Sequence, residues 1–248
     1  TLAGGAISTT GALKVGGTFT WSSGSLTGAG QVSLLGTTNS WSGGTLSGNL
    51  RVASGGTLAM NGGVKNIGNG SLTNQGTVVW SAGNIEQING STAMTIMNQS
   101  GSLFDIQGDL TLGAGSISGN YDNTLTFVNQ AGGELRRSAG TGTTLLGWQS
   151  DGDNGQNFNL QNNGTVNIQT GTVRIGLAGT PAASTGTFGV SGGAVLDYGS
   201  GSHTFTGVTQ SGAGALRLSG GAITFTGAST ATDLQLAGGT LTVSGGGT

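Results

Sequence analysis

The sequence predicts an all-β fold, a parallel β-solenoid of about ten to twelve turns with about 20–25 residues in each turn. Three observations predict it: segments that alternate with a period of two, glycine-rich corners between them, and a repeat of about 20 residues. No segment carries the apolar i, i+3, i+4, i+7 stripe of a helix. Residues 1–248 are therefore expected to form a single solenoid domain.

The predicted strands are rich in Thr, Val, Ile and aromatic residues and are bounded by Gly, Ser or Asn. Clear examples are residues 18–21, 76–80, 222–226 and 240–243. Glycine tolerates the positive φ of a sharp corner, and Gly-Gly pairs occur at 192–193, 220–221 and 238–239. A β-sandwich or a β-propeller is the alternative, but the first needs hairpin turns every 8 to 12 residues and the second a blade of about 40 residues.

A Trp-Ser-x-Gly-x-aliphatic motif begins at Trp21, Trp41 and Trp80. Trp41 follows Trp21 by one turn of the predicted repeat, and Trp80 follows Trp41 by about two. We interpret the three indoles as structural repeat residues that fill or cap the core. The alternative is an exposed aromatic column that stacks on sugars.

A second motif is aliphatic-x-Asn followed by Gly-x-aliphatic, and its structural asparagines are Asn74, Asn98, Asn129 and Asn162. The intervals between them lengthen along the chain, which indicates insertions in its middle. We expect looped insertions near 137–157 and 176–187. Pro181, which has no N–H to donate to a neighbouring strand, should lie in a loop or corner.

The composition excludes several classes of protein. Of 248 residues, 54 are glycine, one is proline and none is cysteine, so collagen, disulfide-rich and thiolate-metal proteins are excluded. The seven basic and nine acidic residues are spread along the chain, which leaves no basic patch for nucleic acid. No apolar run is long enough for a membrane helix. We predict no cofactor, no nucleic-acid partner and no membrane insertion of this segment.

The low charge also fits the predicted fold. In a parallel stack a side chain lies directly above its equivalent one turn away. Two like charges at that spacing repel by about 1 kcal/mol even in water, whereas Thr, Ser, Asn and Gln can form hydrogen-bonded ladders.

Asp105, Asp109 and His203 are the candidates for catalytic groups. In a strand, Asp105 and Asp109 would share one face about 13 Å apart, too far for a glycosidase pair within one turn. We interpret them as solvated surface acids. His203 has no nucleophile motif beside it and is expected to be inert.

The best ligand-binding candidates are Trp148, Asp151 and Asp153, which belong to the expected insertion near 137–157. A loop that protrudes from a rigid scaffold is the usual place for a binding site. Segment 151–155 resembles a calcium loop only superficially, because its glycine is fifth rather than sixth and Asn162 occupies the twelfth position. No metal site is predicted.

Thr-x-Thr pairs occur at 18/20, 124/126, 204/206, 224/226 and 240/242. An ice-binding surface would need such pairs in register on one flat face over many consecutive turns. Only the last three pairs approach the required spacing, and the second of their two intervals is shorter than the first. Solvent-facing threonine ladders are the favoured interpretation.

The strings Asn-x-Gly-Thr-Val, Trp-Ser-x-Gly-x-Leu and Ser-Gly-Gly-Thr-Leu resemble the degenerate repeats of bacterial autotransporter passengers and filamentous-haemagglutinin-like surface proteins. The resemblance covers most of the chain, and its motifs are structural corners. It implies a secreted right-handed β-helix that serves as an adhesin, stalk or display rod.

We therefore expect a non-enzymatic rod at the bacterial cell surface, a stalk or adhesin segment of a larger protein. Its expected partners are host or matrix glycans or surface proteins. One alternative is a self-assembling extracellular fibre, because neither end of the chain carries a charge or proline to block end-to-end association. The other alternative is a polysaccharide-active enzyme.

Overall fold

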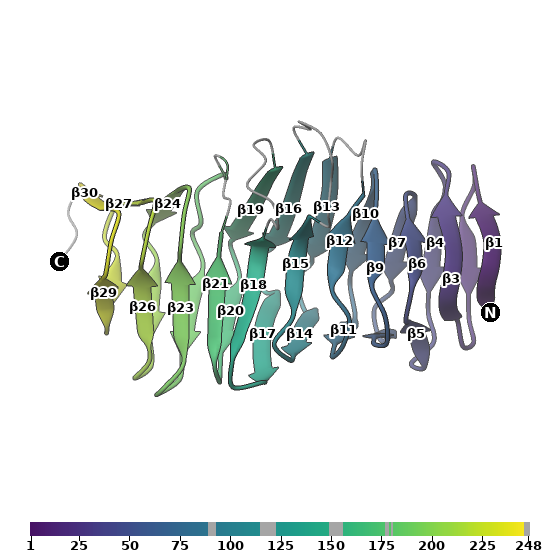
Figure 1. The fold of residues 1–248 in the computed structure, drawn as a ribbon, viewed down its shortest axis with the longest axis horizontal. Coiled ribbons are helices and arrows are strands. Elements are labelled where there is room, and N and C mark those ends of the chain that lie inside the picture. The colour runs from purple at the N-terminus through teal and green to yellow at the C-terminus, as the bar shows by residue number, and fades with distance from the viewer. Residues whose placement is uncertain (89–92, 115–122, 149–155, 177–178, 180, 246–248) are drawn as a thin grey trace.

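The chain winds into a parallel β-solenoid of about 10 turns with about 22 residues in each turn (Figure 1). The computed structural model describes residues 1–88, 93–114, 123–148, 156–176, 179 and 181–245. These residues contain strands and no helix, so the predicted all-β parallel solenoid is confirmed. The first and last strands, β1 (Leu2–Ser8) and β30 (Thr240–Ser244), lie at opposite ends of the rod (Figure 1).

Most turns contribute one strand to each of three faces, here called the first, second and third face in chain order. The first face contains β1, β3 (Thr20–Thr27), β5 (Asn39–Trp41), β8 (Thr57–Met60), β11 (Thr77–Trp80), β14 (Leu103–Gln107), β17 (Glu134–Ala139), β20 (Thr165–Ile168), β22 (Thr187–Val190), β25 (Thr209–Ser211) and β28 (Thr230–Ala231). The second face contains β6 (Gly44–Leu46), β9 (Lys65–Ile67), β12 (Ile85–Gln87), β15 (Thr111–Ala114), β18 (Thr143–Trp148), β21 (Thr172–Ile175), β23 (Val195–Tyr198), β26 (Ala215–Leu218) and β29 (Leu234–Leu236). The third face contains β2 (Leu13–Val15), β4 (Gln31–Leu34), β7 (Asn49–Val52), β10 (Gly70–Asn74), β13 (Ala93–Asn98), β16 (Asn123–Asn129), β19 (Gln156–Asn162), β24 (Ser202–Thr206), β27 (Ala222–Thr226) and β30.

The first and second faces form one sheet of 20 strands, because β1 and β3 continue around the corner between them. The third face consists of two sheets, one of seven strands from β2 to β19 and one of three strands from β24 to β30. Strands of consecutive turns pair in parallel, so each residue lies above an equivalent residue of the next turn.

The core follows from the period-two alternation of these strands. In β8 and β11, for example, half-buried and fully buried side chains alternate, and the fully buried ones point into the rod. The buried apolar side chains form one cluster that extends from Leu2 to Phe225. Near its C-terminal end the rings of Phe205 and Phe225 pack edge to face, 5.4 Å apart, on consecutive turns.

The looped insertions expected near 137–157 and 176–187 both include residues outside the described ones. Within 137–157, strands β17, β18 and β19 cover everything except 140–142 and 149–155, and the latter segment lies outside the described residues. The alternation of this region is hard to recognise because one of its inward positions is an arginine, Arg137. Pro181 lies between β21 and β22, where residues 181–186 form no strand and Ser184 makes an isolated parallel bridge to Phe205.

Candidate functional site

Four buried asparagines form a ladder parallel to the rod axis. Asn74, Asn98, Asn129 and Asn162 are each the last residue of a third-face strand and are paired in register. The Nδ2 of each of the first three donates to the Oδ1 of the next asparagine, at 2.8, 2.9 and 2.8 Å. The side chains are completely buried. An amide suits this position because it carries both a donor and an acceptor.

The same amides also join the third face to the first face. The Nδ2 of each of the four asparagines also donates to a backbone carbonyl of a first-face strand, at 2.8–3.0 Å. The acceptors are Leu103, Glu134, Thr165 and Thr187. The ladder therefore satisfies buried backbone groups at the corner as well as its own polar atoms.

Trp21, Trp41 and Trp80 belong to one inward-facing column of the first face. Trp21 and Trp41 are register partners, and their rings stack 4.7 Å apart with an interplanar angle of 6°. Met60 separates Trp41 from Trp80, which accounts for the interval of two turns. All three indoles are at most 1% exposed, so they fill the core and form no sugar-stacking column on the surface. Gly44, at φ +98°, permits the close approach, because a Cβ there would lie 2.5 Å from Nε1 of Trp21.

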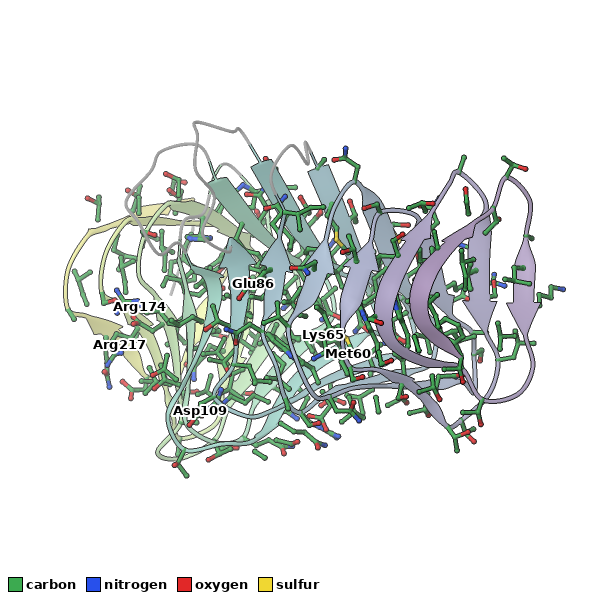
Figure 2. All side chains as sticks on the ribbon, turned by 45° about the vertical axis from the view of Figure 1, so that its right-hand side comes forward. Met60, Lys65, Glu86, Asp109, Arg174 and Arg217 are labelled. Carbon is green, nitrogen blue, oxygen red and sulfur yellow. The ribbon has the colours of Figure 1, made fainter. Side chains whose placement is uncertain are left out.

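A lysine lies inside the rod at the corner between the first and second faces (Figure 2). Lys65 is fully buried, and its Nζ donates to the carbonyls of Gly63 and Ala82, at 2.8 and 2.6 Å. Nearby, the Trp80 Nε1 donates to the Gly83 carbonyl at 2.7 Å. Burial lowers the pKa of Lys65 to about 8. The ammonium thus binds two corner carbonyls that belong to consecutive turns.

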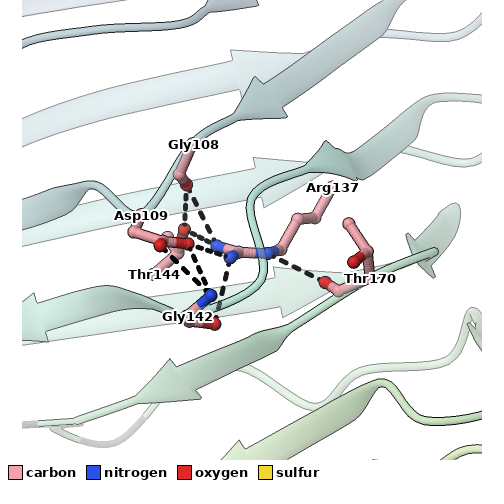
Figure 3. A network of polar contacts seen from close by, with 6 residues as sticks. All are labelled: Gly108, Asp109, Arg137, Gly142, Thr144 and Thr170. Carbon is pink, nitrogen blue, oxygen red and sulfur yellow. Dashed lines mark hydrogen bonds and ion pairs between the residues drawn. The ribbon is translucent and has the colours of Figure 1, made fainter.

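Arg137 has a similar role further along the rod (Figure 3). It continues the tryptophan column, paired with Ile106 on one side and Ile168 on the other, and is completely buried. Its guanidinium donates to the carbonyls of Gly108, Gly142 and Thr170, to Thr144 Oγ1, and at 2.6 Å to Asp109 Oδ1. The network joins three consecutive turns.

Asp109 forms the outer end of this network. Its carboxylate also accepts the backbone N–H of Gly142 at 3.0 and 3.1 Å, while its side chain remains 48% exposed. Asp109 therefore holds a corner of the next turn and compensates the buried charge of Arg137.

The position of Asp105 in the structure contradicts the interpretation from the sequence. The sequence placed it on the solvated surface, yet it is 1% exposed, because Arg136 of the next turn lies over it and donates from Nε and Nη2 at 3.1 and 2.8 Å. Burial by itself would raise the pKa of Asp105. Hydrogen bonds from Arg136, Gln107 and Ser138 and the Arg136 charge outweigh burial and lower this pKa. Asp105 and Asp109 thus bind different arginines and do not form a carboxylate pair.

A similar arrangement of opposite charges lies on the outside of the second face. Asp197 is paired in register with Arg174 on one turn and Arg217 on the other. Its buried Oδ2 lies 3.1 Å from Arg217 Nη2 and 3.9 Å from Arg174 Nη1. Charges therefore do stack along the rod, but with alternating sign, which avoids the repulsion expected for like charges.

His203 is buried on the inner side of β24. Its ring packs edge to face on Tyr198, 4.5 Å between centroids, and its Nε2 lies 3.0 Å from the Ser200 carbonyl. Burial lowers the pKa of His203 to about 4, although the bond to the Ser200 carbonyl opposes the change. The neutral ring is a core side chain at physiological pH.

The structure does not test the predicted ligand-binding residues. Asp151 and Asp153 lie outside the described residues. The backbone of Trp148 ends β18 and pairs with Gly113, and nothing further is described for its side chain.

The sequence pattern did not single out Lys65 or Arg137 as inward residues. The available signal was the alternation itself, since Lys65 occupies the repeat position of Ile85 on the next turn.

Comparison with known proteins found no match among protein-family models, curated proteins or solved structures. Within the described ranges, no three His, Cys, Asp or Glu residues are grouped so that they could hold a metal ion. The same ranges contain no helix that is long and apolar enough to cross a membrane. The chain is a parallel β-helix repeat protein.

Proposed function

We propose that the chain is a structural rod, a stalk or adhesin segment of a bacterial cell-surface protein that acts outside the cell. The resemblance of its corner motifs to autotransporter passengers and filamentous-haemagglutinin-like proteins supports this role. The proposed partners are host or matrix glycans or surface proteins, and the proposed role includes no catalysis.

The observation that carries the proposal is that the polar side chains make contacts between neighbouring turns. The carboxylates of Asp105, Asp109 and Asp197 are bound to arginines on neighbouring turns. The four asparagines of the ladder bind one another. These groups connect turns to one another, which is what a stiff rod requires, and their hydrogen-bonding positions are largely occupied. This arrangement favours a mechanical role over hydrolysis of a glycosidic bond.

Electron microscopy of the purified chain over a range of concentrations tests the proposal. Discrete rods about 50 Å long, the length of ten turns at about 4.8 Å each, are expected. The same preparation should release no reducing sugar or unsaturated product from a panel of acidic and neutral glycans. Product release that is abolished by Asp105→Ala or Asp109→Ala would instead identify an enzyme.

A self-assembling fibre is the second candidate, and the exposed side chains of the C-terminal turn favour it. Leu236 and Val243 are 59% and 57% exposed, and Leu13 at the other end of the rod is 40% exposed. Burial of such side chains against a second copy would be favourable. Filaments with an axial repeat of about 4.8 Å, longer at higher concentration, would establish this candidate and contradict the discrete rod.

A further inference from the structure

The outer side of the three-stranded sheet carries a regular array of hydroxyl groups. Strands β24, β27 and β30 pair without a bulge over five residues each. Their outward residues fall into three columns, and eight of the nine positions are Thr or Ser. We call these nine positions the threonine array: Ser202, Ala222 and Thr240; Thr204, Thr224 and Thr242; Thr206, Thr226 and Ser244.

The register of the array differs from the register of the sequence motif. The last Thr-x-Thr pair begins at Thr240, but Thr224 lies opposite Thr242. The last turn is therefore shorter than the turn before it, in which Thr204 lies opposite Thr224. The offset pairs Thr240 with Ala222 and Ser244 with Thr226, and hydroxyls still fill both outer columns of the last turn.

The backbone positions of the array are fixed by the pairing of its strands. Threonine is stiff about χ1 because it is branched at Cβ, and β27 is hydrogen-bonded on both sides. The hydroxyls of Thr206 and Thr226 lie 2.7 Å apart, one turn from the next. Beneath them the rings of Phe205 and Phe225 pack against each other in the core. The backbone spacing of the array is set by the sheet, at about 4.8 Å between turns and about 6.7 Å between columns, and the bonded hydroxyls of Thr206 and Thr226 lie closer together than that spacing.

Ice is the ligand that such an array fits. Water molecules at an ice surface occupy a fixed two-dimensional lattice, so groups that replace them must repeat at fixed positions. Each threonine offers one hydroxyl that both donates and accepts and one methyl group that excludes liquid water. The array contains no charged side chain, which would hold a disordered hydration shell of its own. We propose that the threonine array is a small ice-binding surface, which extends over three consecutive turns.

The first face offers a matched comparison surface on the same molecule. Thr165, Thr187 and Thr209 also lie in register on consecutive turns and are exposed. The neighbouring outward column there contains Asn167, Gly189 and Ser211, so hydroxyls do not repeat in two dimensions. A single column cannot match a planar lattice, and the first face should not bind ice.

The experiment measures how much protein enters a slowly grown ice hemisphere, relative to a non-binding protein in the same solution. The wild-type chain and Thr187→Lys should be enriched in the ice several-fold over Thr224→Lys, which places a charge at the centre of the array. Thr242→Lys, at an exposed position of the last turn, should also lose enrichment. Circular dichroism melts show whether each variant remains folded.

Two results would overturn the proposal. The first is a wild-type chain that is rejected by the ice to the same extent as the non-binding protein. The second is an equal loss in Thr187→Lys and Thr224→Lys when both are folded, which would indicate an effect of charge that is not specific to the array. Neither result bears on the rod proposed above, which the microscopy tests separately.

Discussion

The side chains of Asn98 and Asn129 lie on consecutive turns, fully buried, with Asn98 Nδ2 donating to Asn129 Oδ1 at 2.9 Å. Asn98 Oδ1 in turn accepts from Asn74 and from Ser102 Oγ, both at 2.8 Å. One amide thus makes four hydrogen bonds that connect three turns when its bond to the Glu134 carbonyl is included. Its loss affects more than one pair of strands.

We therefore expect Asn98→Ala to lower the free energy of unfolding by about 3 kcal/mol, because it leaves buried donors and acceptors without partners. Urea unfolding monitored by circular dichroism measures the change. Gln99→Ala is the matched control, since the side chain of this next residue is only partly buried, accepts one bond from Gln75 and donates to the Met97 sulfur. An equal loss of stability in both variants would show that the ladder does not contribute more to stability than a partly buried side chain beside it.

The buried ammonium of Lys65 should make stability depend on pH in alkaline solution. Its pKa is about 8 in the folded chain and 10.5 for an ordinary lysine. Between these values the unfolded chain binds the extra proton, so stability should rise with pH from about 8 to about 10. The neutral amine keeps two N–H groups, enough for the Gly63 and Ala82 carbonyls. Urea midpoints should rise over this range in the wild-type chain and stay level in Lys65→Met.

In acid, His203 should produce a loss of stability. Its pKa is about 4 in the folded chain, against an ordinary value of 6.5. The unfolded chain therefore binds a proton first as the pH falls from 6.5 to 4, and stability should fall by up to about 3 kcal/mol. In His203→Leu, which matches the aliphatic neighbours Ile223 and Leu241, this contribution should vanish. Identical acid profiles for the two chains would contradict the assignment.

Arg137 and Asp109 should respond unequally to substitution. Arg137→Met removes every donor of a fully buried guanidinium and leaves three carbonyls without that partner, so a loss of about 3–5 kcal/mol is expected. Asp109→Asn keeps an acceptor near Gly142 at a half-exposed position, and its cost should be smaller. The comparison is made by urea unfolding at neutral pH. If Asp109→Asn were the more damaging variant, the charge of Asp109 rather than the buried donors would dominate the network.

The sequence predicted the parts of the fold that depend on repetition. The interval between Trp21 and Trp41 predicted one turn, and the two residues do stack. The shared aliphatic-x-Asn motif grouped the four asparagines before their hydrogen bonds were known. Both predictions succeed because equivalent residues of neighbouring turns meet, so that a repeat in the sequence becomes a column in space.

Other features required the structure, because they depend on how individual corners are closed. Lys65 and Arg137 point inward although charged residues are rarely buried, and only the corner carbonyls beside them explain why. Asp105 is buried by an arginine from the following turn, Arg136. The pairing of Thr224 with Thr242 reflects a shorter last turn that no motif marks.

The interruption of the third face near Pro181 determines how the rod would carry a load. Strands β19 and β24 belong to different sheets, and Ser184 makes the bridge to β24 in this turn, whereas the first and second faces continue past it. Tension along the axis is therefore transmitted at this level by the paired strands of two faces, and on the third face by the few hydrogen bonds that residues 184–186 make to Asn162 and to β24. Under a steady pull we expect the rod to bend at this level first and then to break there. The rod would therefore behave as two stiff segments joined at a weaker point.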